Sequence, residues 1–88
     1  MIINIDDLKK KIVYRATYRG TKEMDKLLGS FTKKFINLFD LNELNDLCDL
    51  LDIEDEVLYK FNQGHEIFIK IKKNKVTELF KNFIYKNE

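Results

Sequence analysis

The chain has 88 residues, of which 44% are hydrophobic and 35% are charged, and this is enough for one domain with one core but too little for two domains. Sixteen Lys and Arg against fifteen Asp and Glu leave a formal charge of +1, which argues against nucleic acid as the main partner. The longest apolar runs hold three residues, as in Ile12 to Tyr14, so no membrane-spanning segment of about 20 residues is expected.

The first predicted helix covers residues 6–18. Leu8, Ile12 and Ala16 recur every four residues, which places them on one helical face. Acidic residues at its start suit the positive end of the helix dipole. The three glycines mark candidate breaks between elements, and Gly20 separates this helix from the next.

The second predicted helix follows Gly20 and has the clearest helical periodicity in the chain. We expect its apolar stripe to form the main wall of the core rather than a cofactor pocket. The stripe consists of Met24, Leu27, Leu28, Phe31, Phe35, Leu38 and Phe39.

The third predicted helix runs from about Leu41 to Leu51. Asp40 precedes Glu43 by three residues, the spacing of a capping box in which two side chains satisfy free amides at a helix start. Cys48 is the only cysteine, so no internal disulfide is possible. Its leucine neighbours predict a small buried side chain rather than a reactive thiol.

The acidic residues 52–56 predict a turn that opens a short fourth helix, with Val57, Leu58 and Phe61 buried. Gly64 is expected to end this helix, because a positive φ is favoured just past a helix. Residues 65–73 are predicted to form an extended connector, since their strand-like alternation has no partner strand in the sequence. His65 is the only histidine, and with one Cys this makes a metal site improbable on ligand count.

The fifth predicted helix covers about residues 74–85, and its inward positions are Val76, Leu79, Phe80 and Phe83. The last residues of the chain are expected to fray. Together these patterns predict an all-α, compact five-helix bundle of short helices that forms one domain over residues 1–88.

The two arginines are the clearest indication of a functional site in the sequence. The chain has fourteen lysines and only two arginines, Arg15 and Arg19, four residues apart. In so lysine-rich a composition, a retained arginine indicates a need for its rigid five-donor guanidinium fork. Aromatic and arginine side chains often anchor protein interfaces, so we predict a partner-binding surface here. Its candidate residues are Tyr14, Arg15, Tyr18, Arg19, Gly20, Glu23 and Asp25.

Gly20 and Glu23 each have two interpretations. Gly20 either supplies the backbone freedom for a turn or lets the backbone of a partner approach closely. Glu23 would pair with Arg19 if the helix continued through Gly20, or would accept hydrogen bonds from the partner. Asp25 is either a polar contact at the rim of the interface or a solvated acid in the first turn of a helix.

The string Tyr-Arg-Ala-x-x-Arg-Gly-x-x-Glu-Met-Asp-x-Leu-Leu-Gly-x-Phe, from Tyr14 to Phe31, resembles the signature of small assembly factors that promote covalent flavin attachment to the flavoprotein subunit of succinate dehydrogenase. The resemblance covers roughly residues 8–64. The sequence departs from that family in having Tyr18 where a second basic residue is usual, Phe61 where the fourth helix usually carries Trp, and residues 65–73 in place of a prolyl segment.

The resemblance implies a five-helix bundle that binds the flavoprotein, and a related fumarate reductase flavoprotein is a further expected client. FAD would belong to that partner, and this chain would bind no cofactor and would not be an enzyme. Arg15 and Arg19 would bond partner carboxylates or carbonyls. Tyr14 and Tyr18 would be anchors if exposed, and Tyr14 could equally fill the junction between the first two helices. We expect a monomer when free and, in the absence of a leader-like N-terminus, a bacterial cytoplasmic location.

Two other classes remain open. Short helices with a glycine-containing turn also describe helical nucleic-acid-binding or regulatory modules. A small enzyme that uses Arg15, Arg19 and Glu23 would need a substrate pocket, which we do not expect in so short a chain.

Overall fold

The computed structural model describes residues 4–86, which form five α-helices and a short 3₁₀ helix and contain no strand. The all-α, five-helix prediction is therefore confirmed. The expected fraying of the last residues falls partly on residues 87–88, outside the described range. The elements are α1 (Ile5–Thr17), α2 (Lys22–Phe35), η1 (Ile36–Leu38), α3 (Leu41–Leu51), α4 (Asp55–Gln63) and α5 (Lys75–Lys81).

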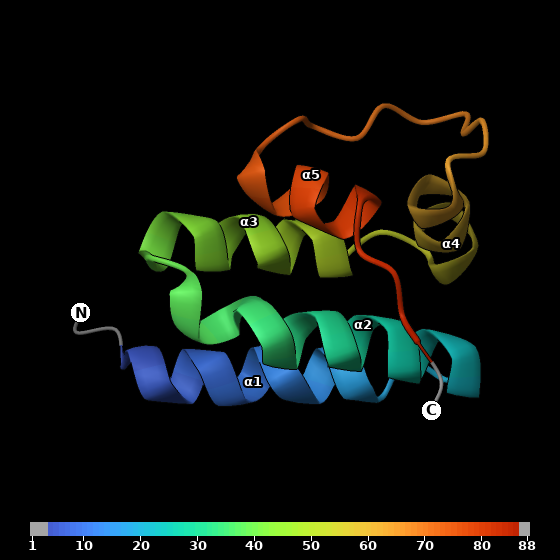
Figure 1. Cartoon of the computed structure of the whole chain (residues 1–88). Coiled ribbons are helices and arrows are strands. Elements are labelled where there is room, and N and C mark those ends of the chain that lie inside the picture. Colours follow the sequence, from blue (N-terminus) through green and yellow to red (C-terminus); the bar gives the residue numbers. More distant parts are fainter. Residues whose placement is uncertain (1–3, 87–88) are drawn as a thin grey trace.

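The helices form two layers (Figure 1). The lower layer in that view is the antiparallel pair α1 and α2, and α3 runs back above α2 with α5 packed against it. The short helix α4 lies at the same end of the molecule as the turn between α1 and α2. This arrangement brings the α1–α2 turn close to the α3–α4 turn.

Side-chain caps begin four of the helices. The carboxylate of Asp40 accepts from the Glu43 amide and the Glu43 carboxylate accepts from the Asp40 amide, both at 2.9 Å, so the predicted capping box is confirmed. Thr21 caps α2, and Asn4 and Asn74 cap α1 and α5. At the end of α4, Gly64 has φ +78°, as predicted for a residue just past a helix.

One hydrophobic cluster joins the two layers. Phe31 of α2 is fully buried, and its ring contacts the rings of Phe35, Phe80 and Phe83 at centroid distances of 5.1 to 5.4 Å. The buried members are Ile12, Ala16, Met24, Leu27, Leu28, Phe31, Ile36, Phe39, Leu44, Leu47, Leu50, Leu51, Leu58, Val76 and Phe80.

Leu38 is the exception within the predicted stripe, because 70% of it is exposed. The chain tightens into the 3₁₀ helix η1 after Phe35, and this change of period turns Leu38 outward and places Ile36 in the core. Cys48 is only partly buried, which differs from the prediction of a buried thiol. Burial nevertheless raises the pKa of its thiol, since desolvation disfavours the thiolate.

Residues 65–73, predicted as an extended connector, form neither helix nor strand and bend at residues 68 and 69. Helix α5 is shorter than predicted and ends at Lys81. The side-chain amide of Asn62 donates to the carbonyls of Phe80 and Phe83 at 2.8 and 2.9 Å. It thereby connects α4 to the last turn of α5 and to the residue after its C-cap.

Candidate docking site at the α1–α2 turn

The α1–α2 turn is fixed by its own backbone and by one carboxylate. Gly20 has φ +121°, a conformation that side chains other than glycine rarely adopt. The Asp25 carboxylate accepts from the backbone amides of Arg19 and Gly20, the latter at 3.2 Å. Gly20 is thus required by the turn, and the Asp25 carboxylate is engaged within the chain.

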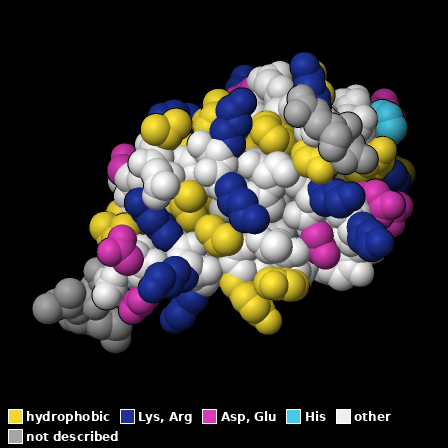
Figure 2. Space-filling view, turned by 60° about the horizontal axis from the view of Figure 1, so that its bottom comes forward, with side chains coloured by type: hydrophobic (Ala, Val, Ile, Leu, Met, Phe, Trp, Pro, Cys, Tyr) yellow, Lys and Arg dark blue, Asp and Glu magenta, His cyan; other side chains and the backbone are white. Residues whose placement is uncertain are grey.

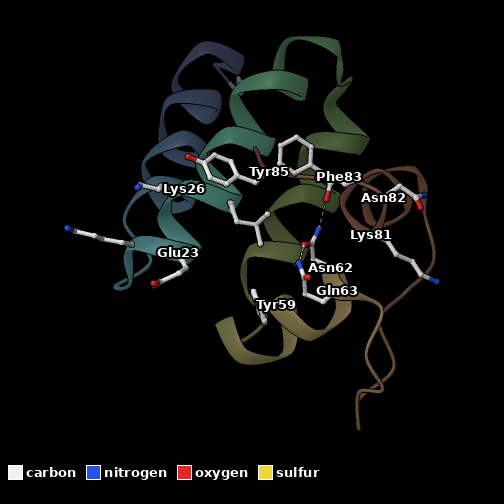
Figure 3. A pocket seen from close by; sticks show the side chains of 12 residues that line it. Glu23, Lys26, Tyr59, Asn62, Gln63, Lys81, Asn82, Phe83 and Tyr85 are labelled. Carbon is white, nitrogen blue, oxygen red and sulfur yellow. Dashed lines mark hydrogen bonds between the residues drawn. The ribbon is translucent and has the colours of Figure 1, made fainter. Parts of the chain in front are cut away.

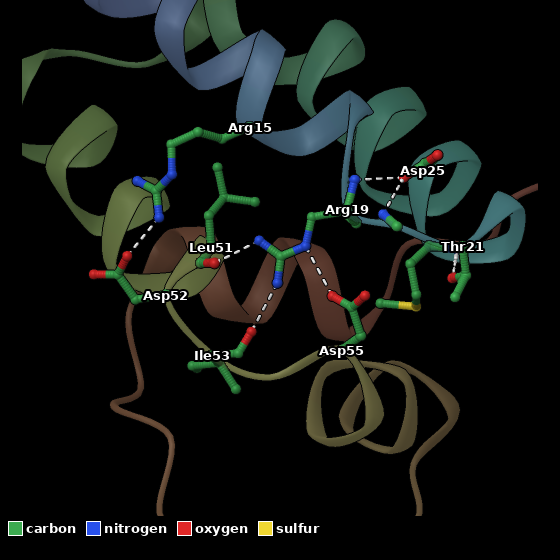
Figure 4. A network of polar contacts seen from close by, with 10 residues as sticks. Arg15, Arg19, Thr21, Asp25, Leu51, Asp52, Ile53 and Asp55 are labelled. Atoms are coloured by element: carbon green, nitrogen blue, oxygen red, sulfur yellow. Dashed lines mark hydrogen bonds and ion pairs between the residues drawn. The ribbon is translucent and has the colours of Figure 1, made fainter.

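Arg19 points into the molecule and fastens two turns together (Figure 4). Its Nε donates to Oδ1 of Asp55 at 2.8 Å, Nη2 donates to the Ile53 carbonyl at 2.8 Å, and Nη1 donates to the Leu51 carbonyl. Only 11% of its side chain is exposed. Arg19 therefore satisfies carbonyls at the end of α3 while it pairs with the first residue of α4.

Arg15 is placed differently. Its Nη2 donates to Oδ1 of Asp52, and 39% of its side chain is exposed. Asp52, which follows α3, keeps 68% of its side chain exposed. This pair lies at the rim of the site, where an ion pair between solvated partners contributes at most about 1 kcal/mol.

Tyr14 and Tyr18 form the exposed aromatic part of the site. Their ring centroids are 4.7 Å apart, and the residues are 66% and 68% exposed. Both belong to the segment at the end of α1, one turn apart. Neither ring belongs to the hydrophobic core. Both rings are therefore accessible for an intermolecular contact.

Glu23 does not pair with Arg19. Helix α1 ends at Thr17 and the turn at Gly20 interrupts the helical spacing on which that pair depends. Glu23 is exposed near the start of α2 and lines a separate groove. The sequence-predicted residues are therefore not all brought together on one surface.

The hollow between the two turns has a volume of about 520 Å³. It contains four of the predicted residues and adds the α3–α4 turn, which the prediction of site residues omitted. The sequence did contain a signal for this turn: an acidic segment, residues 52–56, in a chain that has only two arginines. The hollow is lined by Tyr14, Arg15, Tyr18, Arg19, Leu51, Asp52, Ile53, Glu54 and Asp55.

A larger groove, of about 820 Å³, lies between α2, α4 and the segment after α5 (Figure 3). The expectation that so short a chain has no substrate-sized pocket is therefore wrong. However, Glu23 lines this groove whereas Arg15 and Arg19 line the hollow on the other side of the turn. The three residues proposed for an enzyme site do not converge on one cavity.

The surface charges and the side chains of residues 4–86 bear on the other site types considered from the sequence. In Figure 2, Lys and Arg side chains are scattered among hydrophobic and neutral ones on the face shown. Within residues 4–86, no group of three His, Cys, Asp or Glu residues is placed to hold a metal ion. None of the helices described is both long and apolar enough to cross a membrane.

Fold and site together define the class: a small all-α protein with an exposed aromatic pair beside an internally fastened turn. A comparison with protein families shows the family to which the chain belongs. The profile of the Sdh5 family, described as flavinator of succinate dehydrogenase, matches residues 10–84, and the chain belongs to this family.

The match confirms the resemblance seen in residues 14–31 and extends it through the connector and α5. The departures at Tyr18, Phe61 and residues 65–73 therefore lie within the family match. The chain matches no curated protein and no solved structure.

Proposed function

We propose that this chain is an assembly factor that binds the flavoprotein subunit of succinate dehydrogenase and promotes covalent attachment of FAD to it. The observation that carries the proposal is the Sdh5 family match over residues 10–84, which includes the whole segment from Tyr14 to Asp25. The exposed pair Tyr14 and Tyr18 supports it, because large aromatic side chains supply contact area at little entropic cost.

In this proposal the chain holds its partner and does not react. Covalent flavinylation joins a histidine of the flavoprotein to the methyl carbon of the isoalloxazine ring, and it depends on alignment of the two groups. Stabilising an aligned conformation of the partner can lower a barrier by several kcal/mol without a new reactive group. The docked factor is not an enzyme, and FAD is bound by the partner.

The site residues have distinct roles in the proposal. Tyr14, Tyr18 and Arg15 contact the flavoprotein, because their side chains are exposed at the rim of the hollow. Gly20 and Asp25 keep the turn in shape, and the open space around the Gly20 Cα also permits a close approach of the partner backbone. Glu23 offers a carboxylate at the edge of the contact.

The proposal also covers the oligomeric state of the factor, its location and a second client. The free factor is a monomer in the bacterial cytoplasm, and a related fumarate reductase flavoprotein is a second client. The nucleic-acid-binding alternative gains no support from the family match or from the scattered distribution of Lys and Arg on the face shown in Figure 2.

The test is reconstitution with the purified flavoprotein subunit, FAD and this chain. Covalent flavin is measured as fluorescence of the denatured subunit in a gel, and the chain is expected to increase its rate of formation. A double variant Tyr14→Ala, Tyr18→Ala should lose most of the increase. The matched control is Tyr59→Ala, which removes a partly exposed tyrosine of α4 outside the hollow. Equal fluorescence with and without the chain would reject the proposed function.

A further inference from the structure

We infer that the flavoprotein presents a cationic side chain, arginine or lysine, to a surface formed by Tyr14, Tyr18, Asp52 and Glu54, called here the tyrosine–carboxylate surface. This inference rests on the proposed function and specifies the chemistry of the contact. It differs from the expectation from the sequence, in which the arginines of this chain were to bond carboxylates or carbonyls of the partner.

The first step is that Arg19 uses three of its five N–H donors within the chain and is largely buried. Nε, Nη1 and Nη2 of Arg19 each donate to an acceptor in the α3–α4 turn, and the side chain is 11% exposed. The two remaining N–H groups belong to a side chain that is only 11% exposed, so a partner carboxylate has little access to them. Arg19 is therefore a positioning residue, which holds the α3–α4 turn beside α1.

The second step concerns Glu54, which occupies the N-cap position of α4 but makes no capping hydrogen bond. Ser, Thr, Asp and Asn are the residues that stabilise a helix at this position. The Glu54 residue is exposed and forms no ion pair within residues 4–86. Its charge thus serves no contact in the described part of the chain, although it borders the hollow.

The third step is the charge balance of the hollow. Its lining contains three carboxylates, of Asp52, Glu54 and Asp55, and two guanidinium groups. Arg19 neutralises Asp55 and Arg15 is paired with Asp52. One negative charge, that of Glu54, is left over, and Asp52 remains mostly exposed beside it. The accessible part of the hollow therefore favours a cation.

The fourth step is the tyrosine pair. The rings of Tyr14 and Tyr18 lie 4.7 Å apart and line the same hollow as the carboxylates. An aromatic face attracts a cation through its quadrupole, and a guanidinium also stacks on it. Exposed rings bordering unused carboxylate oxygens provide both contacts that a buried arginine or lysine needs at an interface.

The experiment measures the affinity of the full chain for the flavoprotein subunit at low and high salt. We expect Glu54→Lys to weaken binding by about tenfold at low salt and by less at high salt, because like charges would then face each other. The matched control is Glu56→Lys, which changes an exposed acid of α4 that pairs with Lys60 and does not line the hollow. It should bind within about twofold of the unmodified chain.

A second set of variants tests the aromatic contribution. The pair Tyr14→Phe, Tyr18→Phe keeps both ring faces and should retain affinity, whereas Tyr14→Leu, Tyr18→Leu keeps apolar area alone and should lose about fivefold or more. Circular dichroism confirms that each variant is folded. Since these side chains are exposed, none of the changes removes a core contact.

The outcomes separate this inference from the proposed function. If the unmodified chain binds the flavoprotein and Glu54→Lys binds it equally well or more tightly, the cationic contact alone is overturned. The same holds for a loss of affinity confined to Arg15→Ala, which would mean that the partner presents a carboxylate. Failure of the unmodified chain to bind at any salt overturns both.

Discussion

Nε of Arg19 and Oδ1 of Asp55 are 2.8 Å apart, although the two residues are 36 positions apart in the sequence. The pair joins the end of α1 to the first residue of α4. Since the same guanidinium also binds the carbonyls of Leu51 and Ile53, one side chain connects both turns that form the hollow. The shape of the candidate docking site therefore depends on Arg19 even if no partner atom contacts it.

Replacement of Arg19 by lysine is expected to destabilise the fold. An ammonium group cannot reproduce the three separated donors, so carbonyls at the end of α3 lose their partners. We expect a loss of about 2 kcal/mol or more in the free energy of unfolding, since hydrogen bonds to charged groups contribute about 1.5 to 3 kcal/mol each. Urea denaturation followed by circular dichroism measures it. Arg15→Lys is the control, and an equal loss there would contradict the distinction between the two arginines.

Gly20→Ala tests whether the turn itself requires glycine. A Cβ at this position would meet no atom within 4 Å, but φ is +121°, so the cost comes from backbone strain alone. We expect a loss of about 1 to 3 kcal/mol in the free energy of unfolding with the helical spectrum intact. Gly64→Ala changes another exposed glycine of positive φ and should lose stability for the same reason. An unchanged urea midpoint for Gly20→Ala would mean that the glycine serves docking only.

The predictable part of the fold came from local signals. The stripe from Met24 to Phe31 and the capping box of Asp40 and Glu43 are encoded within a few residues, because helical periodicity and caps are short-range features. Leu38 was mispredicted because the change from α to 3₁₀ helix after Phe35 alters the period without altering the hydrophobic pattern. Extrapolating one period across such a change assigns the wrong face.

The contacts of Arg19 could not be predicted from the sequence, and the reason differs from that for Leu38. Two of its acceptors are backbone carbonyls, of Leu51 and Ile53, and every residue carries a carbonyl, so side-chain identity provides no signal. Asp55 was the detectable partner, since the acidic residues 52–56 are a natural source of acceptors for a rare guanidinium. The exposure of Tyr14 and Tyr18 was the condition for their role as anchors, and the alternative in which Tyr14 fills the junction between the first two helices is wrong. Sequence alone could not decide between the two, because exposure at a helix end depends on how the helices pack.

Phe31→Ala is expected to cost about 3 to 5 kcal/mol, because the ring is fully buried and its removal leaves a cavity. Three other phenylalanine rings would lose a neighbour. Phe31→Leu should cost less and keeps the measurement possible if the alanine variant does not fold. Leu38→Ala, at the exposed position of η1, should change the urea midpoint little. A large effect there would contradict its outward placement.

Glu43 should make stability depend on pH. Its carboxylate accepts from the Asp40 amide and lies 3.1 Å from the ammonium of Lys75, and these contacts lower its pKa below the ordinary value of 4.5. A lowered folded-state pKa means a contribution that is present above about pH 4.5 and is lost as the pH falls through the folded-state value. Glu43→Gln should therefore lower the thermal midpoint at pH 7 and reduce its further fall on acidification. An acid dependence identical to that of the unmodified chain would contradict this assignment.

Gly29→Ala is expected to stabilise the fold. Gly29 lies inside α2 and is buried against the end of α1, and glycine in a helix interior costs about 0.5 to 1 kcal/mol relative to alanine. An added Cβ would lie 3.6 Å from Oγ1 of Thr17 and 3.8 Å from its Cα, which is ordinary van der Waals contact, so neither helix needs to move. We therefore expect a gain of about 0.5 to 1 kcal/mol in the free energy of unfolding, measured by urea denaturation. Gly29→Val is the contrasting variant, because its branched side chain would press α1 away from α2. A loss of stability in the alanine variant would mean that the two helices pack more closely at Thr17 than these contacts indicate.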